Sequence, residues 1–110
     1  QMDFTKRYKD ISSNEIIEAF HVSKMNLKNI HEWPIWLVEA ANRPTAADGK
    51  FYHGEYSTWI ENYGYSYTCL TVDKVRKVVH GTDYIIRHET GKLDVCRPEV
   101  FEIRYREIED

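Results

Sequence analysis

Residues 81–108 predict five consecutive elements: a turn, a strand, a second turn, a second strand and a helix. Tyrosine and isoleucine gather in 83–89, which favours a strand, and Gly91 favours a chain reversal before a returning strand over 93–96. Pro98 suits a first helical turn, where its missing N–H would have no partner in any case. The C-terminal unit is therefore a β-hairpin followed by a helix.

The two strands of this hairpin also suggest a register. A four-residue connection places Arg87 opposite Asp94 and Ile86 opposite Val95, so that an ion pair lies on one face and an apolar pair on the other. In the helix that follows, Phe101 and Tyr105 lie one turn apart. We expect both rings to face the sheet.

Further upstream, the sequence predicts one strand and one helix. The segment NEIIEAFHV favours a strand over 15–22, although SSNEIIEAF also resembles a capped helix start. Apolar residues at helical spacing predict a helix from near Trp33 to before Arg43, with Pro34 at its opening and a loop over 45–50. Residues 1–14 are predicted to form a loosely ordered N-terminal arm.

The middle of the chain shows two competing periodicities. Aromatic residues recur at helical spacing from Tyr52 to Tyr63, yet Tyr63, Tyr65 and Tyr67 alternate as they would in a strand. We expect a strand over 65–72 and a turn at Asp73-Lys74 that leads into a strand over 75–79. The state of 55–62, helical turn or strand, stays open.

Together these elements predict a single α+β domain: a small antiparallel sheet with a central helix and a short C-terminal helix. The 110 residues are 42% hydrophobic and 30% charged, a balance that indicates neither a disordered tail nor a membrane protein. We expect a soluble protein of the cytoplasm, with both cysteines reduced. The net charge of -3 argues against a nucleic-acid partner.

The C-terminal unit resembles the signature of a family of small proteins from tailed bacteriophages and prophages. That signature runs Pro-Gly-Asp-Tyr/Trp-Ile-Ile, a glycine turn, Tyr-Pro-Cys-Lys-Pro-Asp, then Phe and Tyr. The positions that match it here are Asp83, Tyr84, Ile85, Ile86, Gly91, Cys96, Pro98, Phe101 and Tyr105. The segments IIEAF and WPIWLVEA are similar to the opening strand and a helix of that family, so the resemblance covers both ends of the chain.

The resemblance implies a phage or prophage origin and a shared fold. Phage proteins of this size are often accessory factors that bind and inhibit host or defence components, or that sequester small signals. The chain departs from the signature at Gly81, where the family has Pro, and at Thr82, where it has Gly. Asp94 and Val95 replace Tyr-Pro, so the turn before the first hairpin strand need not be the same.

Three features are candidates for chemistry, and each has a structural alternative. Cys96 precedes a predicted helix and is a candidate nucleophile, or else a small buried hydrophobe. Asp83 follows a turn and either binds a ligand or, more commonly, hydrogen-bonds its own turn. His80, His88 and the two cysteines lack the spacing of a zinc site. With no catalytic motif, we expect no enzyme activity, no metal and no cofactor.

The aromatic residues give a better binding hypothesis. They make up 14% of the chain, more than one small core hides, and include the residue types that dominate interface hot spots. The predicted binding residues are Tyr56, Trp59, Tyr63, Tyr65, Tyr67 and Arg76. The alternative is that the rings form the core face of the sheet.

The resemblance implies an accessory role and the aromatic residues suggest binding, and together they lead to one functional expectation with several versions. We expect an accessory protein of the bacterial host cytoplasm that binds and inhibits a host or anti-phage defence protein without catalysis. The alternatives are a virion or assembly component and a nucleotide sponge, in which a base stacks on the rings and Arg76, Lys74 or Lys77 meets phosphate. Open sheet edges also make a homodimer plausible.

Overall fold

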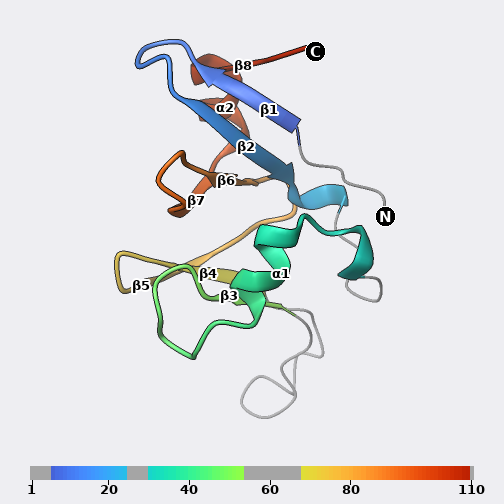
Figure 1. The fold of residues 1–110 in the computed structure, drawn as a ribbon, viewed down its shortest axis with the longest axis vertical. Coiled ribbons are helices and arrows are strands. Elements are labelled where there is room, and N and C mark those ends of the chain that lie inside the picture. Colours follow the sequence, from blue (N-terminus) through green and yellow to red (C-terminus); the bar gives the residue numbers. More distant parts are fainter. Residues whose placement is uncertain (1–5, 25–29, 54–67, 110) are drawn as a thin grey trace.

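The computed structural model describes residues 6–24, 30–53 and 68–109, which form two antiparallel sheets and short helices (Figure 1). The first sheet has five strands in the order β7-β6-β2-β1-β8, and the second has three in the order β3-β4-β5. The strands of the first sheet are β1 (Lys6–Asp10), β2 (Ile16–His21), β6 (Tyr84–Arg87), β7 (Leu93–Cys96) and β8 (Tyr105–Glu107). The remaining elements are β3 (Phe51–Tyr52), β4 (Cys69–Val72), β5 (Val75–Val78), helices α1 (Ile35–Ala41) and α2 (Pro98–Arg104), and the 3-10 turns η1 (Val22–Lys24) and η2 (Ile30–Glu32).

The two faces of the five-stranded sheet bury different partners. One face packs on α2 through a cluster of Ile17, Ala19, Ile86, Cys96, Phe101 and Tyr105. The other face packs on α1 and the three-stranded sheet through Phe20, Trp33, Leu37, Ala40, Phe51, Leu70, Val72, Val79, Ile85 and Leu93. The predicted α+β class is confirmed, although the strands form two sheets instead of one. Among the described residues, no helix is long and apolar enough to cross a membrane.

The upstream predictions hold closely. The strand predicted over 15–22 is β2, whose alternation sends Ala19 to the α2 side of the sheet and Phe20 to the α1 side. The helix predicted after Trp33 is α1, with Pro34 at its N-cap and with Leu37 and Ala40 buried. The predicted loop over 45–50 contains no helix or strand.

The predicted N-terminal arm is wrong for residues 6–14. β1 lies inside the five-stranded sheet, paired with β2 on one side and β8 on the other. Only Asp10 of the strand is buried, so its sequence KRYKD has almost none of the apolar alternation that marks a strand. Tertiary pairing, not local propensity, places this segment in the sheet.

The predicted hairpin register is wrong by one residue. Ile85 lies opposite Val95, Ile86 opposite Asp94 and Arg87 opposite Leu93. The reason is Gly91, whose φ of +91° adds a left-handed residue to the turn and leaves a three-residue loop between His88 and Lys92. The predicted ion pair is therefore absent from this strand pair, and Arg87 faces Glu18 of β2 at 3.4 Å instead.

The C-terminal helix is shorter than its apolar spacing suggests. α2 ends at Arg104, and Tyr105 begins β8. Phe101 and Tyr105 nevertheless face the sheet as predicted, each 4% exposed. The Phe101 ring stacks on Tyr84 with 3.8 Å between centroids, and this contact fixes α2 over β6.

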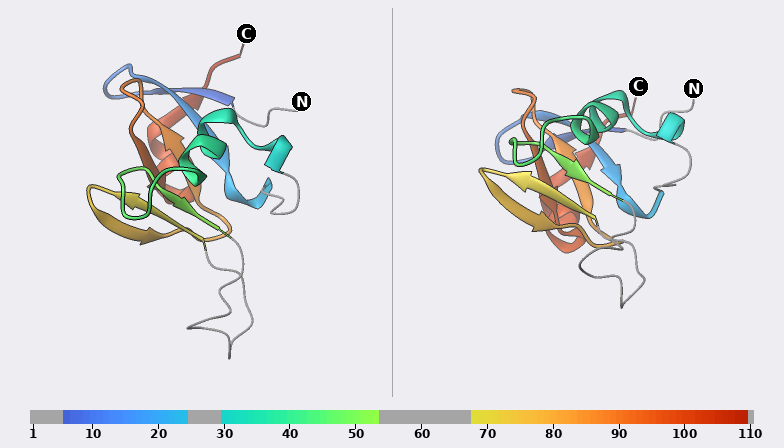
Figure 2. Two further views of the ribbon diagram at one scale, coloured as in Figure 1. Left: turned by 60° about the horizontal axis from the view of Figure 1, so that its bottom comes forward. Right: turned by 90° about the horizontal axis from the view of Figure 1, so that it is seen from below.

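The second predicted hairpin is confirmed as β4 and β5. Asp73 and Lys74 form its two-residue turn with φ values of +51° and +68°, the left-handed pair that a tight hairpin turn requires. Both views of Figure 2 show this hairpin at the rim of the molecule. The predictions for 55–62 and for 65–67 lie outside the described residues.

Candidate binding surface

β5, one of the two edge strands of the three-stranded sheet, is exposed along its whole length. β5 pairs with β4 on one side, and all four of its residues are solvent-exposed, whereas all four residues of β4 are buried. Val75 is 59% exposed and Val78 is 49% exposed, unusual values for valines in a strand. We call Tyr52, Val75, Arg76, Lys77 and Val78 the β5 surface.

Arg76 and Tyr52 form the best-defined contact of this surface. The Arg76 guanidinium lies 4.2 Å from the centroid of the Tyr52 ring, a cation–π distance. The Tyr52 hydroxyl accepts a hydrogen bond from the backbone N–H of Ala46 at 2.9 Å. Burial raises the pKa of this hydroxyl, but hydrogen bonds from Ala46, Arg76 and Thr71 outweigh it, so the pKa lies below its ordinary value of 10.0. Arg76 and the ring therefore form one preorganised unit at the surface.

The two lysines of the hairpin have different partners. The Lys77 ammonium lies 3.3 Å from the Asp94 carboxylate of β7 and ties the two sheets together. Lys74 sits in the turn, and its backbone N–H donates to the Asp48 carboxylate at 2.8 Å. Both side chains stay partly or fully exposed, so the strand and its turn present cations to solvent.

Only one of the predicted binding residues lies within the described part of the chain. Arg76 is on β5, in contact with Tyr52. The other five, Tyr56, Trp59, Tyr63, Tyr65 and Tyr67, lie outside the described residues. The chain connects them to the same sheet, because β3 ends at Tyr52 and β4 begins at Cys69, directly opposite Val78.

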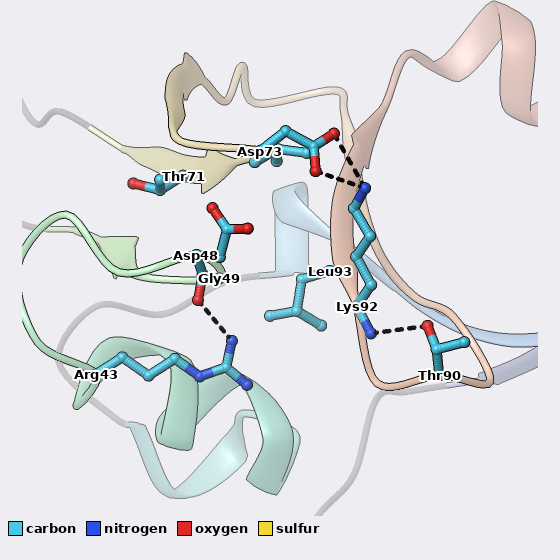
Figure 3. Close-up of a pocket in the computed structure, with 9 residues that line it drawn as sticks. Arg43, Asp48, Gly49, Thr71, Asp73, Thr90, Lys92 and Leu93 are labelled. Carbon is cyan, nitrogen blue, oxygen red and sulfur yellow. Dashed lines mark hydrogen bonds and ion pairs between the residues drawn. The ribbon is translucent and has the colours of Figure 1, made fainter.

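A pocket of about 260 Å³ lies between the 43–49 loop and the turns of the two hairpins (Figure 3). The Lys92 ammonium donates to both oxygens of the Asp73 carboxylate, at 2.8 and 3.0 Å. This hydrogen bond holds the pKa of Asp73 below its ordinary value and the pKa of Lys92 above it. On the other wall, the Arg43 guanidinium donates to the Asp48 carbonyl at 3.1 Å.

These contacts make the pocket a junction between loops. Gly49 lies against Arg43, where a Cβ would stand 1.7 Å from the guanidinium nitrogen, and its φ is +78°. The volume is below the range of about 300–1,000 Å³ that is usual for ligand pockets. Its carboxylates and cations already bind one another or the backbone, so we assign the pocket a structural role.

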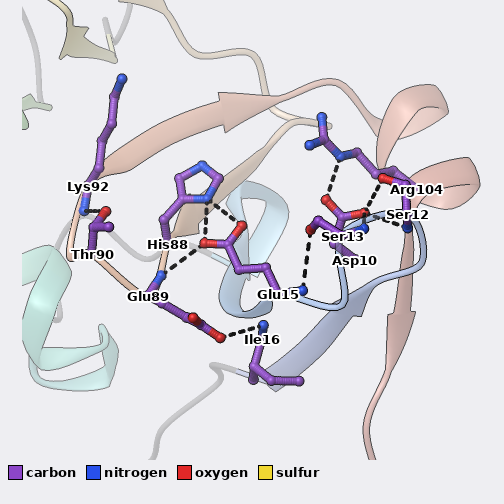
Figure 4. A network of polar contacts seen from close by, with 10 residues as sticks. All are labelled: Asp10, Ser12, Ser13, Glu15, Ile16, His88, Glu89, Thr90, Lys92 and Arg104. Atoms are coloured by element: carbon purple, nitrogen blue, oxygen red, sulfur yellow. Dashed lines mark hydrogen bonds and ion pairs between the residues drawn. The ribbon is translucent and has the colours of Figure 1, made fainter.

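Buried and half-buried carboxylates elsewhere hold loops in place (Figure 4). Asp10 is fully buried at the end of β1 and accepts hydrogen bonds from the Ser12 N–H at 2.9 Å and hydroxyl at 2.8 Å. Arg104 of α2 donates to its other oxygen at 2.9 Å. The Ser12 and Arg104 donors hold the pKa of Asp10 well below its ordinary range. This contact fixes the β1–β2 turn on the C-terminal helix.

A second contact joins the same turn to the β6–β7 hairpin. His88 Nδ1 lies 3.1 Å from the Glu15 carboxylate, and the Glu89 N–H donates to that carboxylate at 3.1 Å. The Glu89 carboxylate in turn accepts a hydrogen bond from the Ile16 N–H at 3.0 Å. Burial raises the pKa of Glu15, but the bonds from Glu89 and His88 outweigh it and leave the pKa lowered.

The candidate catalytic groups have structural surroundings. Cys96 is 8% exposed, and burial raises the pKa of its thiol, which favours the unreactive form and fits the buried-hydrophobe alternative. Asp83 accepts from the His80 N–H at 2.9 Å, which confirms that it binds its own turn. In the described part of the chain, no three histidine, cysteine or acidic side chains gather as metal ligands.

A second exposed apolar surface is formed by α2 and the β1–β2 turn. Ile103 is 73% exposed, and Val100 and Ile11 are 47% and 53% exposed. They line a wide, open groove with Ser12 and Arg104. We call these three apolar residues the α2 groove and use them below as the comparison for the β5 surface.

Comparisons of the chain with protein-family models, with curated proteins and with solved structures find no match.

Sequence reasoning missed the exposed valines of β5, though a signal for them was present. In Val-Arg-Lys-Val the two cations are adjacent, so in a strand they point to opposite faces. Neither face of such a strand is fully buried, which is typical of a sheet edge. The sequence contains no comparable signal for the Tyr52–Arg76 contact, because that contact joins residues on different strands.

Proposed function

We propose that this protein is a phage or prophage accessory factor that binds a host or anti-phage defence protein and inhibits it without catalysis. The observation that supports binding is the β5 surface, where two exposed valines lie on the same strand as a cation stacked on a tyrosine. Arginine and tyrosine are enriched among interface hot spots, and their preorganised contact lowers the entropic cost of binding. The predicted aromatic residues of 56–67 come between β3 and β4 in the sequence.

The surroundings of the ionisable groups favour binding over chemistry. In the described residues, the buried carboxylates Asp10 and Asp83 each hold a turn, and the Cys96 thiol is shielded by burial. A catalytic group needs access to a substrate and a pKa matched to its task. These groups are better suited to holding a rigid platform for the exposed surface.

Native mass spectrometry of the tagged protein recovered from a bacterial lysate tests this proposal, with a denaturing spectrum of the same sample. We expect a second protein in fixed stoichiometry, lost after denaturation. A small added mass would instead indicate a nucleotide sponge, and a bare chain together with its presence in purified virions would indicate an assembly component. Either result would contradict the proposal.

Two matched substitutions assign the binding to a surface. Arg76→Glu reverses the charge on the β5 surface, and Ile103→Glu introduces the same carboxylate at an exposed residue of the α2 groove. We expect the first to remove the partner and the second to retain it, with circular dichroism to confirm that both variants fold. The reverse pattern would move the binding site to α2.

A further inference from the structure

We propose that β5 binds its partner by strand addition, and that the segment it accepts is extended, acidic at its centre and apolar on either side. The inference rests on the proposed function and adds the mode of binding and the chemistry of the partner. It starts from the backbone of the outer strand.

Among the described residues, the edge of β5 that faces away from β4 pairs with no other strand. The Val79 N–H donates to the Thr68 carbonyl at 2.9 Å, so the backbone N–H and C=O of Val79 point toward the β4 side. Hydrogen-bonded residues alternate in an antiparallel ladder, so the N–H and C=O groups of Lys77 and Val75 also point toward β4. Those of Arg76 and Val78 point away from β4, toward the open edge. No strand of the described residues lies beyond that edge.

The side chains of β5 define what the added strand must carry. Arg76 and Val78 share the face of Tyr52, whereas Val75 and Lys77 share the face of Leu70 and Val72. An added strand would thus meet an apolar residue, two cations and an apolar residue in succession, with no acidic residue from 74 to 78. Opposite-charge and apolar cross-strand pairs stabilise such an arrangement. The complementary segment is apolar, acidic, acidic, apolar.

The same charges disfavour a second copy of this chain. In an antiparallel pair of two copies, Arg76 and Val78 must each lie opposite Arg76 or Val78 of the other copy, because only these residues of the strand point their N–H and C=O groups outward. The two allowed registers with the greatest overlap pair three of the four residues, and they place Arg76 opposite its own copy or Lys77 opposite its own copy. Like charges directly opposite one another are destabilising, so β5 is protected from self-pairing.

Asp94 and Tyr52 already hold the two cations in position. Lys77 contacts Asp94 at 3.3 Å with about half of its ammonium-bearing side chain exposed, and Arg76 stacks on Tyr52. Neither contact requires the cation to move before an acidic side chain arrives from the open edge. The surface is thus preorganised for an anionic strand.

The test uses a fluorescein-labelled peptide of sequence Thr-Val-Glu-Glu-Val-Thr and the full chain, with binding followed by fluorescence anisotropy. A peptide with lysine in place of both glutamates is the charge control. We expect the acidic peptide to bind at least about tenfold more tightly than the basic one. Equal binding of the two, or no binding of the acidic peptide at millimolar concentration, would overturn the inference.

Two substitutions at one position test the backbone contact. Val78→Pro removes an N–H that points away from β4, which edge strands tolerate, and Val78→Thr keeps the N–H and the β-branched shape. We expect Val78→Pro to reduce the affinity for the acidic peptide about tenfold, and Val78→Thr to leave that affinity within about threefold of the wild type. Equal affinity of both variants for the peptide would refute strand addition, as would a homodimer that Val78→Pro dissociates.

The lysate complex separates this inference from the proposed function. If a captured partner stays on the Val78→Pro chain, the binding function stands and strand addition fails. If Val78→Pro loses the partner and Val78→Thr keeps it, both claims are supported. If no partner protein is captured although the acidic peptide binds β5 as expected, the inhibitor proposal fails while the strand-acceptor property of β5 stands.

Discussion

Asp10 is a buried carboxylate whose charge is used to join two distant parts of the chain. It is 0% exposed, and its donors come from the adjacent turn and from Arg104 near the other end of the sequence. Removing Arg104 would take one donor from the buried Asp10 carboxylate, whereas the half-exposed Arg104 side chain can still be solvated. Nothing in the sequence distinguishes Asp10 from the other acidic residues, because its importance depends on contacts made across 94 positions.

The lowered pKa of Asp10 predicts a specific acid response. The folded chain binds the carboxyl proton less readily than the unfolded chain, whose ordinary pKa is 3.8. The stability from this group is therefore fully present above about pH 4 and falls as the pH drops toward the folded pKa. In urea titrations from pH 7 to pH 2, Asp10→Asn should be less stable at pH 7 and lose less stability in acid.

The exposed Glu109 provides the control for that experiment. Glu109→Gln should follow the wild-type curve throughout. If Asp10→Asn were to show the same acid slope as the wild type, the Asp10 contacts would not carry the acid sensitivity.

At the level of elements, apolar spacing accounts for the successes of the sequence prediction, whereas one turn and one exposed strand account for its errors. The strands over 83–89 and 93–96 and the helix after Trp33 were identifiable because their apolar spacing agrees with their burial. The hairpin register could not be identified from the sequence, because it depends on one left-handed residue, Gly91, in the turn. β1 was missed because four of its five residues remain accessible, so no apolar pattern marks it.

The left-handed conformation of Gly91 can be tested by substitution. Gly91→Ala should reduce the free energy of unfolding by about 1–2 kcal/mol, because an alanine pays a steric penalty at positive φ. Gly81→Ala is the matched control: a Cβ there meets nothing within 4 Å, so we expect a change within about 0.5 kcal/mol. Chemical denaturation measures both, and equal effects would contradict the assignment of the turn.

For the molecule as a whole, the layers place a rigid body behind an exposed strand. The five-stranded sheet lies between α2 on one face and α1 with the second sheet on the other (Figures 1 and 2). β5 is one of the two edge strands of that second sheet and carries its exposed valines and cations. Of the predicted site, Arg76 lies on this strand, whereas the aromatic members lie outside the described residues and stay a prediction.

An activity titration of the captured partner distinguishes inhibition by stoichiometric binding from a catalytic effect. A fixed amount of the partner is mixed with increasing amounts of this protein, and its remaining activity is measured after short and long incubation. We predict a linear loss of activity that ends at a fixed molar ratio, is unchanged by longer incubation and recovers when the complex is separated. Complete, time-dependent loss at a small fraction of that ratio would show a catalytic effect and contradict the account.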